Sequence, residues 1–541
     1  MKPCLPGKAG LFHQQVAAHK QGRWVRHYFW VFAERFGAQF LKIVAIFILA
    51  RILTPHDVGL YAMVGIVVSI ANMLIDSGLS GSLIRKRTLT NADYSTVFIF
   101  NLVVALLFYG LAFLLAPVVA GFYKEPELDW LIKVLSVTVI IRSLGLIQIT
   151  KLTKELRFKS QSFIFILAGV FSLAVAYSMA IQGYGYWALV GQQIAETVFT
   201  LLACWLHTRY FPGLRLSMTL LREHFGFGSR LMLAGVAEVI YQNIVVVAAG
   251  KSAGAGVAGH YAQAARVSEV FTALATTIVE KTSFPILVRR AEFKPLYLHY
   301  AAGLLRSACL ISFLGIAILV ACASQITHVV LGEQWSDSAW MLQIIALSGY
   351  GVMVEAVSRS LLKSQGRSDL ILTISIAKGA VSIAVLLLLS LWGIKTLLWG
   401  FVALSGASAL LNCYVVSRVI DYRLWQQVKD LLQILGVSLV VIGAVSALAP
   451  WVKAPPVAAL LLLTGCAMVL YCSLAFFLQI RECRVVRSYL LAQVQQRVPR
   501  KSAVRPPVTQ PPDTRGSGDE VPSAPPASAA LQATSGYTTL P

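Results

Sequence analysis

Charged residues are scarce in this sequence of 541 residues. Asp, Glu, Lys and Arg make up only 13% of it, whereas 57% of the residues are hydrophobic and the mean hydropathy is +0.71. A soluble domain carries about 25% charged residues, because its surface has to face water. The shortage of charge therefore excludes a soluble globular protein and indicates an integral membrane protein.

Acidic residues are rarer than basic ones: 24 Asp and Glu stand against 46 Lys and Arg, which gives a net charge of +22. Nucleic-acid-binding proteins have a similar excess, but they gather their cations on one face. Here the cations stand between apolar runs, which is the arrangement that sets the orientation of a membrane protein. We therefore expect no nucleic-acid partner.

Paired cysteines and catalytic motifs are missing as well. The eight cysteines occur singly, without C-x-x-C or matching His spacing, which argues against a metal site or a disulfide framework. The sequence contains no D-x-D, H-E-x-x-H, G-x-S-x-G or G-x-x-x-x-G-K-[ST] run. We expect a transporter rather than an enzyme, without cofactor, metal or ATP. Its energy would come from an ion gradient, the membrane potential or the substrate gradient.

Long apolar runs, by contrast, fill the chain up to about residue 480. A helix that crosses a bilayer needs about 20 mostly apolar residues. The first run is too long for a cleaved signal peptide and lacks a cleavage site, so it is expected to act as an uncleaved anchor. The sequence predicts an all-α polytopic membrane protein with about 14 transmembrane helices, at about 29–53, 57–84, 94–119, 128–150, 161–182, 185–207, 226–250, 256–283, 298–323, 339–362, 369–391, 395–417, 431–449 and 457–480.

The charges of the connections alternate along this series. Connections on the side of the N-terminus carry 31 Lys and Arg, and those on the other side carry five. Because positively charged connections stay in the cytoplasm, both termini are expected to be cytoplasmic.

An internal repeat divides the chain. The stretch Arg51–Arg87 is echoed by residues 250–290, Trp130 and Trp340 stand 210 residues apart, and Arg157 and Arg367 have the same offset. This repeat predicts two homologous lobes of six helices each. Because each lobe has an even number of spans, both have the same orientation and are related by an axis along the membrane normal. The predicted parts are a basic cytoplasmic N-terminus (1–28), an N-lobe (29–210), a cytoplasmic linker (211–225), a C-lobe (226–418), two extra spans (431–480) and a basic, then Pro/Ser/Ala-rich disordered cytoplasmic tail (481–541).

Several charged residues lie inside the predicted spans. A charge near the bilayer centre costs at least about 2.5–3.5 kcal/mol, so it usually faces a partner or a wet cavity. Arg266 and Glu269, and Glu355 and Arg359, are spaced to pair within one helix. The deep cations without a local partner indicate a negatively charged substrate. We predict a cationic substrate cavity from Lys42, Arg142, Arg266, Arg306 and Lys378, and coupling or gating roles for Asp76, Glu196, Glu238 and Glu269.

Several stretches carry a resemblance to a known family. RILTPHDVGLY, LIDSGLSGSLIRKR, KLTKELRFKSQSF, VAGHYAQAARV and KSQGRSDL, in this order and spacing, resemble the polysaccharide flippases of the multidrug/oligosaccharidyl-lipid/polysaccharide exporter superfamily, nearest the colanic-acid and teichuronic-acid type. The likeness covers about residues 30–480. It implies a V-shaped pair of lobes around a cavity lined by spans 1, 2, 7 and 8, which places Lys42, Asp76, Glu238 and Arg266 at the site.

The resemblance also implies a substrate and a setting. An oligosaccharide repeat unit on undecaprenyl pyrophosphate would cross the bacterial inner membrane by alternating access, with membrane lipid around it. A polysaccharide polymerase and a chain-length regulator are possible partners, and H⁺ or Na⁺ is a possible coupling ion. Relatives often carry an acidic residue in an N-x-x-D-type run of span 7; the run Asn243–Val246 has none. Either Glu238, one turn earlier, replaces it, or coupling differs.

Three other functions stay open. A small-molecule antiporter of the same superfamily is disfavoured by the intramembrane cations, which would repel cationic drugs. A membrane polysaccharide polymerase or ligase would favour a large external loop, which the sequence lacks. A scaffold for the polysaccharide-assembly machinery would use the basic loops and the tail to dock its partners.

Overall fold

Long helices build the whole structure, a computed structural model that describes residues 37, 39–76, 79–86, 89–213, 215–288 and 294–478. Within these ranges it has no strand. The predicted N-terminus 1–28 and tail 481–541 lie outside them. The described residues all belong to one unit, Met1–Val485. The predicted all-helical class is confirmed.

The first half of the described chain follows the predicted spans closely. Its helix α4 begins with a capping box, in which Thr90 and Asp93 each bond the backbone N–H of the other. Helix α5 has acidic residues in its first turn and Lys151 and Lys154 in its last, which suits the helix dipole at both ends. The helices are Gln39–Leu49, α2 (Pro55–Asp76), α3 (Leu79–Arg85), α4 (Asn91–Tyr123), α5 (Glu127–Lys154), α6 (Phe158–Ile181) and α7 (Trp187–Thr208).

The second half opens on one helix of 71 residues, α8, which contains both predicted spans 7 and 8. Gly254 interrupts it with a φ of 82°, a left-handed conformation that glycine adopts without strain. The helices are α8 (Met218–Val288), α9 (Lys294–Ala321), α10 (Ala323–Ile326), η1 (Thr327–Leu331), η2 (Glu333–Trp335), α11 (Ser338–Ser364), α12 (Ser368–Leu389), η3 (Ser390–Trp392), α13 (Ile394–Ile420), α14 (Leu424–Leu448), η4 (Ala449–Trp451) and α15 (Pro456–Phe477).

Eleven helices of the described chain are long and apolar enough to cross a membrane. They correspond to predicted spans 2–6 and 9–14. Of the first predicted span, only residues from 37 on are described. The total of fourteen spans therefore stays a prediction. The eleven helices are nevertheless enough to establish a membrane protein that crosses the bilayer many times.

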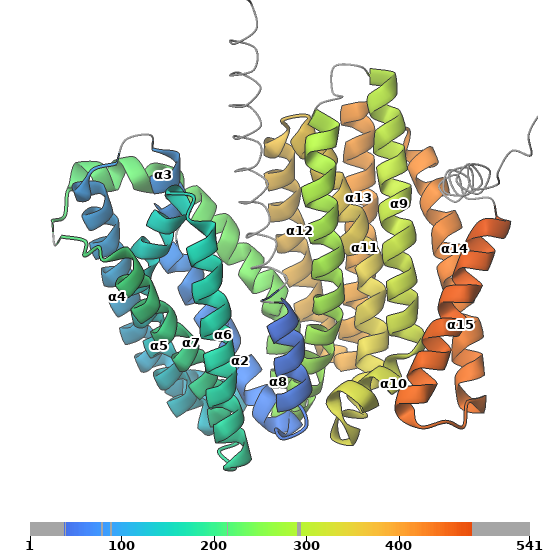
Figure 1. Cartoon of the computed structure of the whole chain (residues 1–541), viewed down its shortest axis with the longest axis horizontal. Helices are drawn as coiled ribbons and strands as arrows, with labels where there is room; N and C mark the ends of the chain where they lie inside the picture. The colour runs from blue at the N-terminus through green and yellow to red at the C-terminus, as the bar shows by residue number, and fades with distance from the viewer. Residues whose placement is uncertain are drawn as a thin grey trace, which may run out of the picture. The chain divides into compact units, whose positions relative to one another are not determined.

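Helices of each half pack against one another. Helices α4, α5, α7 and α6 follow each other side by side, and α9, α11 and α13 do the same in the second half (Figure 1). Small residues such as Ala116, Ala168 and Ala176 are buried where these helices meet, while Leu107 and Leu206 point outward. Apolar side chains on the outside are expected where lipid tails replace water as the solvent.

The two halves meet where α2 crosses α8. A Cβ atom at Gly59 would overlap the carbonyl oxygen of Ala255, and a Cβ atom at Gly259 would overlap that of Pro55. The two glycines are 200 residues apart, and so are Pro55 and Ala255. The stretch Arg51–Arg87 and the similar stretch 250–290 thus bring their backbones into direct contact, and only glycine allows so close an approach.

Candidate functional site

A polar cavity lies among four helices drawn from both halves. It has a volume of about 250 Å³, and its walls come from the Gln39–Leu49 helix, α2, α7 and α8. Four predicted site residues line it, namely Lys42, Glu196, Arg266 and Glu269. We call it the central cavity.

The two cations of the central cavity are only loosely engaged. The Lys42 ammonium lies 3.9 Å from a carboxylate oxygen of Glu269, and both side chains are more than 60% exposed. Arg266 donates one long hydrogen bond of 3.4 Å to Gln263, and its guanidinium lies 6.0 Å from the ring centre of Tyr61. An exposed, long ion pair such as Lys42–Glu269 contributes about 0–1 kcal/mol, and the hydrogen bond of Arg266 is near the upper limit of length. A ligand with a phosphate group can therefore displace them.

A second cavity of about 260 Å³ adjoins the first within the N-terminal half. It lies among α2, α3, α5, α6 and α7, and Gln193 and Glu196 line both cavities. We call it the side cavity. Asp76 and Arg142 line it together with several threonines. Among the described residues, no carboxylate comes within 4.0 Å of the Arg142 guanidinium.

Two predicted cavity cations lie elsewhere and are tightly paired. The Lys378 ammonium lies 2.7 Å from Glu355, a nearly buried carboxylate that also pairs with Arg359 at 3.2 Å. Arg306 pairs with Asp430 of α14 at 3.1 Å. Short, buried pairs are the usual fate of charge inside a membrane protein. For these cations the protein itself supplies the anion.

The predicted gating residue Glu238 also lies apart from the two cavities. Its side chain is exposed on the first half of α8, where it accepts a hydrogen bond of 2.9 Å from Gln242. Six of the nine predicted site residues, by contrast, line these two neighbouring cavities: Lys42, Asp76, Arg142, Glu196, Arg266 and Glu269.

These six charges balance. Three cations and three carboxylates line the two cavities, so the formal charge of this region is zero rather than positive. Any anion that binds here has to compete with carboxylates already present. The lining offers both hydrogen-bond donors and acceptors, which suits a ligand that carries hydroxyl groups as well as phosphate.

Reasoning from charges alone missed the most abundant polar group of the central cavity. Glutamines from three helices line it: Gln39, Gln192, Gln193 and Gln263. The available signal was the occurrence of uncharged amides within otherwise apolar spans, because a buried amide also needs a partner.

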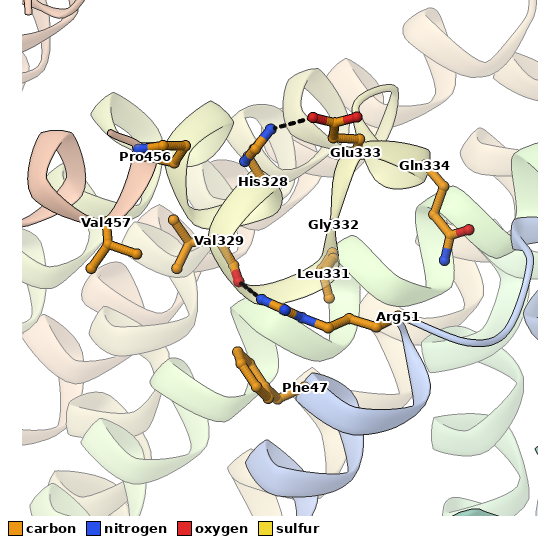
Figure 2. Close-up of a pocket in the computed structure, with 10 residues that line it drawn as sticks. All are labelled: Phe47, Arg51, His328, Val329, Leu331, Gly332, Glu333, Gln334, Pro456 and Val457. Carbon is orange, nitrogen blue, oxygen red and sulfur yellow. Dashed lines mark hydrogen bonds and ion pairs between the residues drawn. The ribbon is translucent and has the colours of Figure 1, made fainter. Parts of the chain in front are cut away.

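One end of the central cavity is closed by contacts between the two halves. The indole of Trp335, which is fully buried, donates to the carbonyl of Ala50 at 2.7 Å. Gln334 donates to the carbonyls of Ala50 and Leu53. From the other direction, Arg51 donates to the carbonyl of Val329 at 2.8 Å (Figure 2). The bonds to Ala50 and Leu53 satisfy carbonyls of the turn that follows the Gln39–Leu49 helix, whereas the bond from Arg51 satisfies a carbonyl of the segment Thr327–Leu331. We call this contact the seal.

A shallow pocket of about 620 Å³ lies beside the seal and shares Arg51 and Gln334 with it. Figure 2 shows Arg51 reaching across it above Phe47, while His328 points toward Glu333, 3.3 Å away. The π-helical segment η1 contributes His328, Val329 and Leu331 to its wall. Such segments often occur at functional sites, because the extra residue per turn redirects side chains and carbonyls.

The sequence places the protein among known families. The pattern of the polysaccharide biosynthesis protein family (Polysacc_synt_3) matches residues 48–340, which is more than half of the chain. The chain belongs to the polysaccharide biosynthesis protein family. The matched segment contains the seal, the side cavity, and Glu196, Arg266 and Glu269 of the central cavity, whereas Gln39 and Lys42 lie before it.

Two bacterial relatives of the family are similar to this chain. The teichuronic acid biosynthesis protein TuaB of Bacillus subtilis (strain 168) is 25% identical over 306 residues, which are 56% of this chain and 62% of TuaB. The lipopolysaccharide biosynthesis protein WzxC of Escherichia coli (strain K12) is 25% identical over 340 residues, 61% of this chain and 68% of WzxC. The match thus spans less than two thirds of TuaB.

A solved structure has the same fold. The lipid II flippase MurJ, in an inward closed conformation, superposes with a TM-score of 0.68 at 11% identity, over 83% of this chain and 98% of MurJ. At this identity the likeness concerns the fold. The predicted resemblance to proteins of polysaccharide biosynthesis is confirmed by the family match and by these relatives.

Proposed function

We propose that this protein is a flippase that moves an undecaprenyl-pyrophosphate-linked oligosaccharide across the bacterial inner membrane. The observation that carries the proposal is the central cavity, where Lys42 and Arg266 stand loosely engaged beside a set of amides. We assign both termini to the cytoplasm, because the connections on their side carry 31 Lys and Arg residues.

The chemistry of such a substrate explains why a protein is needed. A pyrophosphate with attached sugars cannot cross hydrocarbon unaided, because its charges and hydroxyls would lose their water. Charge-assisted hydrogen bonds from Lys42 and Arg266 replace that water at the phosphates. The polyprenyl tail needs no such help and stays in the lipid throughout.

Transport further requires the cavity to open on each side in turn. The seal closes one end through Trp335, Gln334 and Arg51, and we assign this end to the periplasmic side. A substrate from the cytoplasmic leaflet then enters while the seal is intact and leaves when it opens. A ligand moves this equilibrium by as much as its affinities for the two states differ.

The first experiment follows the lipid-linked repeat units in a strain that lacks the gene. We expect polymer to be lost and undecaprenyl-linked units to accumulate in the cytoplasmic leaflet, where an impermeant glycan-modifying reagent added from outside does not reach them. Units that reach the periplasm unpolymerised would identify a polymerase instead.

A second experiment tests the cations. Lys42→Gln and Arg266→Gln each remove one charge-assisted hydrogen bond, worth about 1.5–3 kcal/mol, so export is expected to fall about 10–100-fold. Arg367→Gln is the matched control, because Arg367 pairs with Asp369 on the surface and lines neither cavity. Immunoblots of the membrane fraction verify equal amounts. Full export by both cavity variants would refute the proposal.

One observation favours an alternative substrate class. The carboxylates of Glu196 and Glu269 make the central cavity suitable for a cationic small molecule as well. A normal polymer in the deletion strain, together with increased sensitivity to cationic dyes, would establish that antiporter function.

A further inference from the structure

The amides of the central cavity form a layer with contributions from three helices. Gln39 comes from the first helix, Gln192 and Gln193 from α7, and Gln263 from α8. Gln263 is almost completely buried, at 2% exposure, and the other three are partly exposed. Side chains that belong to both halves of the chain therefore surround a ligand placed here.

The side-chain amides of Gln193 and Gln263 already make hydrogen bonds, which determine which of their atoms can still bind a ligand. The carbonyl oxygen of Gln193 accepts from the hydroxyl of Tyr61 at 3.1 Å. That of Gln263 accepts from Arg266 at 3.4 Å. Each carbonyl oxygen is therefore engaged, and the N–H₂ group, with two donors, is what these side chains present to a ligand.

This donor set comes together with acceptors and apolar surface. The carboxylates of Glu196 and Glu269 accept hydrogen bonds, and Ile46, Leu53 and Val58 supply apolar contacts in the same cavity. Phosphate oxygens can only accept, so they have no use for the carboxylates. A sugar ring, by contrast, has hydroxyls that donate and accept as well as apolar C–H faces.

The size of the cavity limits how much of the head group it holds. At about 250 Å³ it is smaller than the pockets of about 300–1,000 Å³ that enclose drug-sized ligands. It therefore holds a part of the lipid-linked head group, not a whole repeat unit. The sugar nearest the pyrophosphate is the part that stays beside Lys42 and Arg266.

We propose that Gln192, Gln193 and Gln263 bind the sugar next to the pyrophosphate and make the protein select sugar-bearing over sugar-free undecaprenyl pyrophosphate. The proposal rests on the flippase function proposed above. It assigns phosphate binding to the cations and selection to the amides. Such discrimination prevents transport of the empty carrier lipid, which shares the pyrophosphate and the tail of the substrate.

The test compares two probes on the full-length protein in lipid nanodiscs. One probe is undecaprenyl pyrophosphate, and the other is the lipid-linked repeat unit extracted from the strain that lacks the gene. The wild type is expected to bind the repeat unit at least 10-fold more tightly. Gln193→Leu and Gln192→Leu are each expected to weaken binding of the repeat unit about 5–10-fold while binding of the bare lipid changes less than twofold.

Two further variants separate the possible outcomes. Gln242→Leu is the matched control, since Gln242 is a glutamine of α8 that bonds Glu238 and lines neither cavity. It is expected to bind both probes like the wild type. Because Gln263 is buried, Gln263→Leu is judged only together with its melting temperature, and the partly exposed Gln192 carries the test if that variant unfolds.

The proposal is overturned if the wild type does not distinguish the probes, or if the glutamine variants weaken both probes equally or neither. Lys42→Gln and Arg266→Gln report on the underlying function separately, because they are expected to weaken both probes to the same extent. If these two variants leave both affinities unchanged, the phosphate-binding part fails, whereas the ratio between the probes still decides the role of the amides.

Discussion

At the scale of single residues, the structure divides the intramembrane cations by the quality of their partners. Lys42 and Arg266 have distant partners in a cavity, whereas Lys378 and Arg306 have close ones between packed helices. The sequence treats these four alike, because each is a cation within an apolar run. The distance between each cation and the nearest carboxylate is what distinguishes them. A cation with a distant carboxylate is available to a ligand, whereas a cation with a close carboxylate is part of the packing between helices.

The sequence predicted some of these partners and missed others for a physical reason. Glu355 and Arg359 form the predicted i,i+4 pair. Glu269, however, lies beside Lys42 of another helix instead of pairing with Arg266 three residues earlier. Helical spacing shows which side chains can reach each other along one helix. It contains no information on a neighbouring helix that offers a competing charge.

The Lys378–Glu355 pair allows a test of a purely structural role. Lys378→Met leaves Glu355 with Arg359 as its remaining cation, so we expect a loss of about 1–3 kcal/mol of stability. The double variant Lys378→Met/Glu355→Gln removes the charge on both sides and is expected to recover part of that loss. Thermal unfolding of the purified variants measures both. Equal melting temperatures for the wild type and Lys378→Met would contradict a stabilising pair.

At the scale of helices, the glycine crossing between α2 and α8 is the point where the two halves come closest. Gly59→Ala and Gly259→Ala each place a methyl group on the opposite carbonyl oxygen, so the helices have to move apart. Overpacking of this kind costs about 1–3 kcal/mol. We expect lower melting temperatures together with reduced export.

Matched controls for the crossing lie on the same two helices. A methyl group at Gly65 of α2 or at Gly256 of α8 meets no atom within 4 Å. Gly65→Ala and Gly256→Ala are therefore expected to retain the stability and export of the wild type. If all four variants behave alike, close contact at the crossing has no importance for folding or transport.

The seal is another contact between helices of different halves, and hydrogen bonds to backbone carbonyls hold it together. Trp335→Ala removes a bonded and fully buried indole. We expect the seal to open more often, so that a cysteine introduced at Gln192 reacts at least fivefold faster with an impermeant maleimide added from outside. Trp392→Ala is the control, because Trp392 is an exposed tryptophan of η3. Unchanged labelling in Trp335→Ala would show that the seal does not control access.

At the scale of the whole molecule, composition and apolar runs predicted the architecture well. Eleven of the fourteen expected spans correspond to described helices that are long and apolar enough to cross a membrane, and Gly59 and Gly259, one from each of the two similar stretches, meet at the crossing of α2 and α8. Membrane helices are predictable because each has to satisfy its own backbone in lipid. The cavity was not predictable to the same degree, because its walls come from four helices whose packing no local pattern describes.

Removal of the C-terminal tail distinguishes a transport function of the whole molecule from a scaffolding function. All helices described above lie within Met1–Val485, and the chain after it, Val486–Pro541, is rich in proline, serine and alanine. A flippase needs only the helices that form its cavities and its seal, so truncation after Val485 should leave export within about twofold of the wild type. A scaffold would instead depend on the segments that reach its partners. Polymer output of the truncated protein, compared at equal membrane levels, measures the difference. Loss of export in this variant, with the repeat unit still bound in nanodiscs, would mean that the tail recruits a partner on which transport depends.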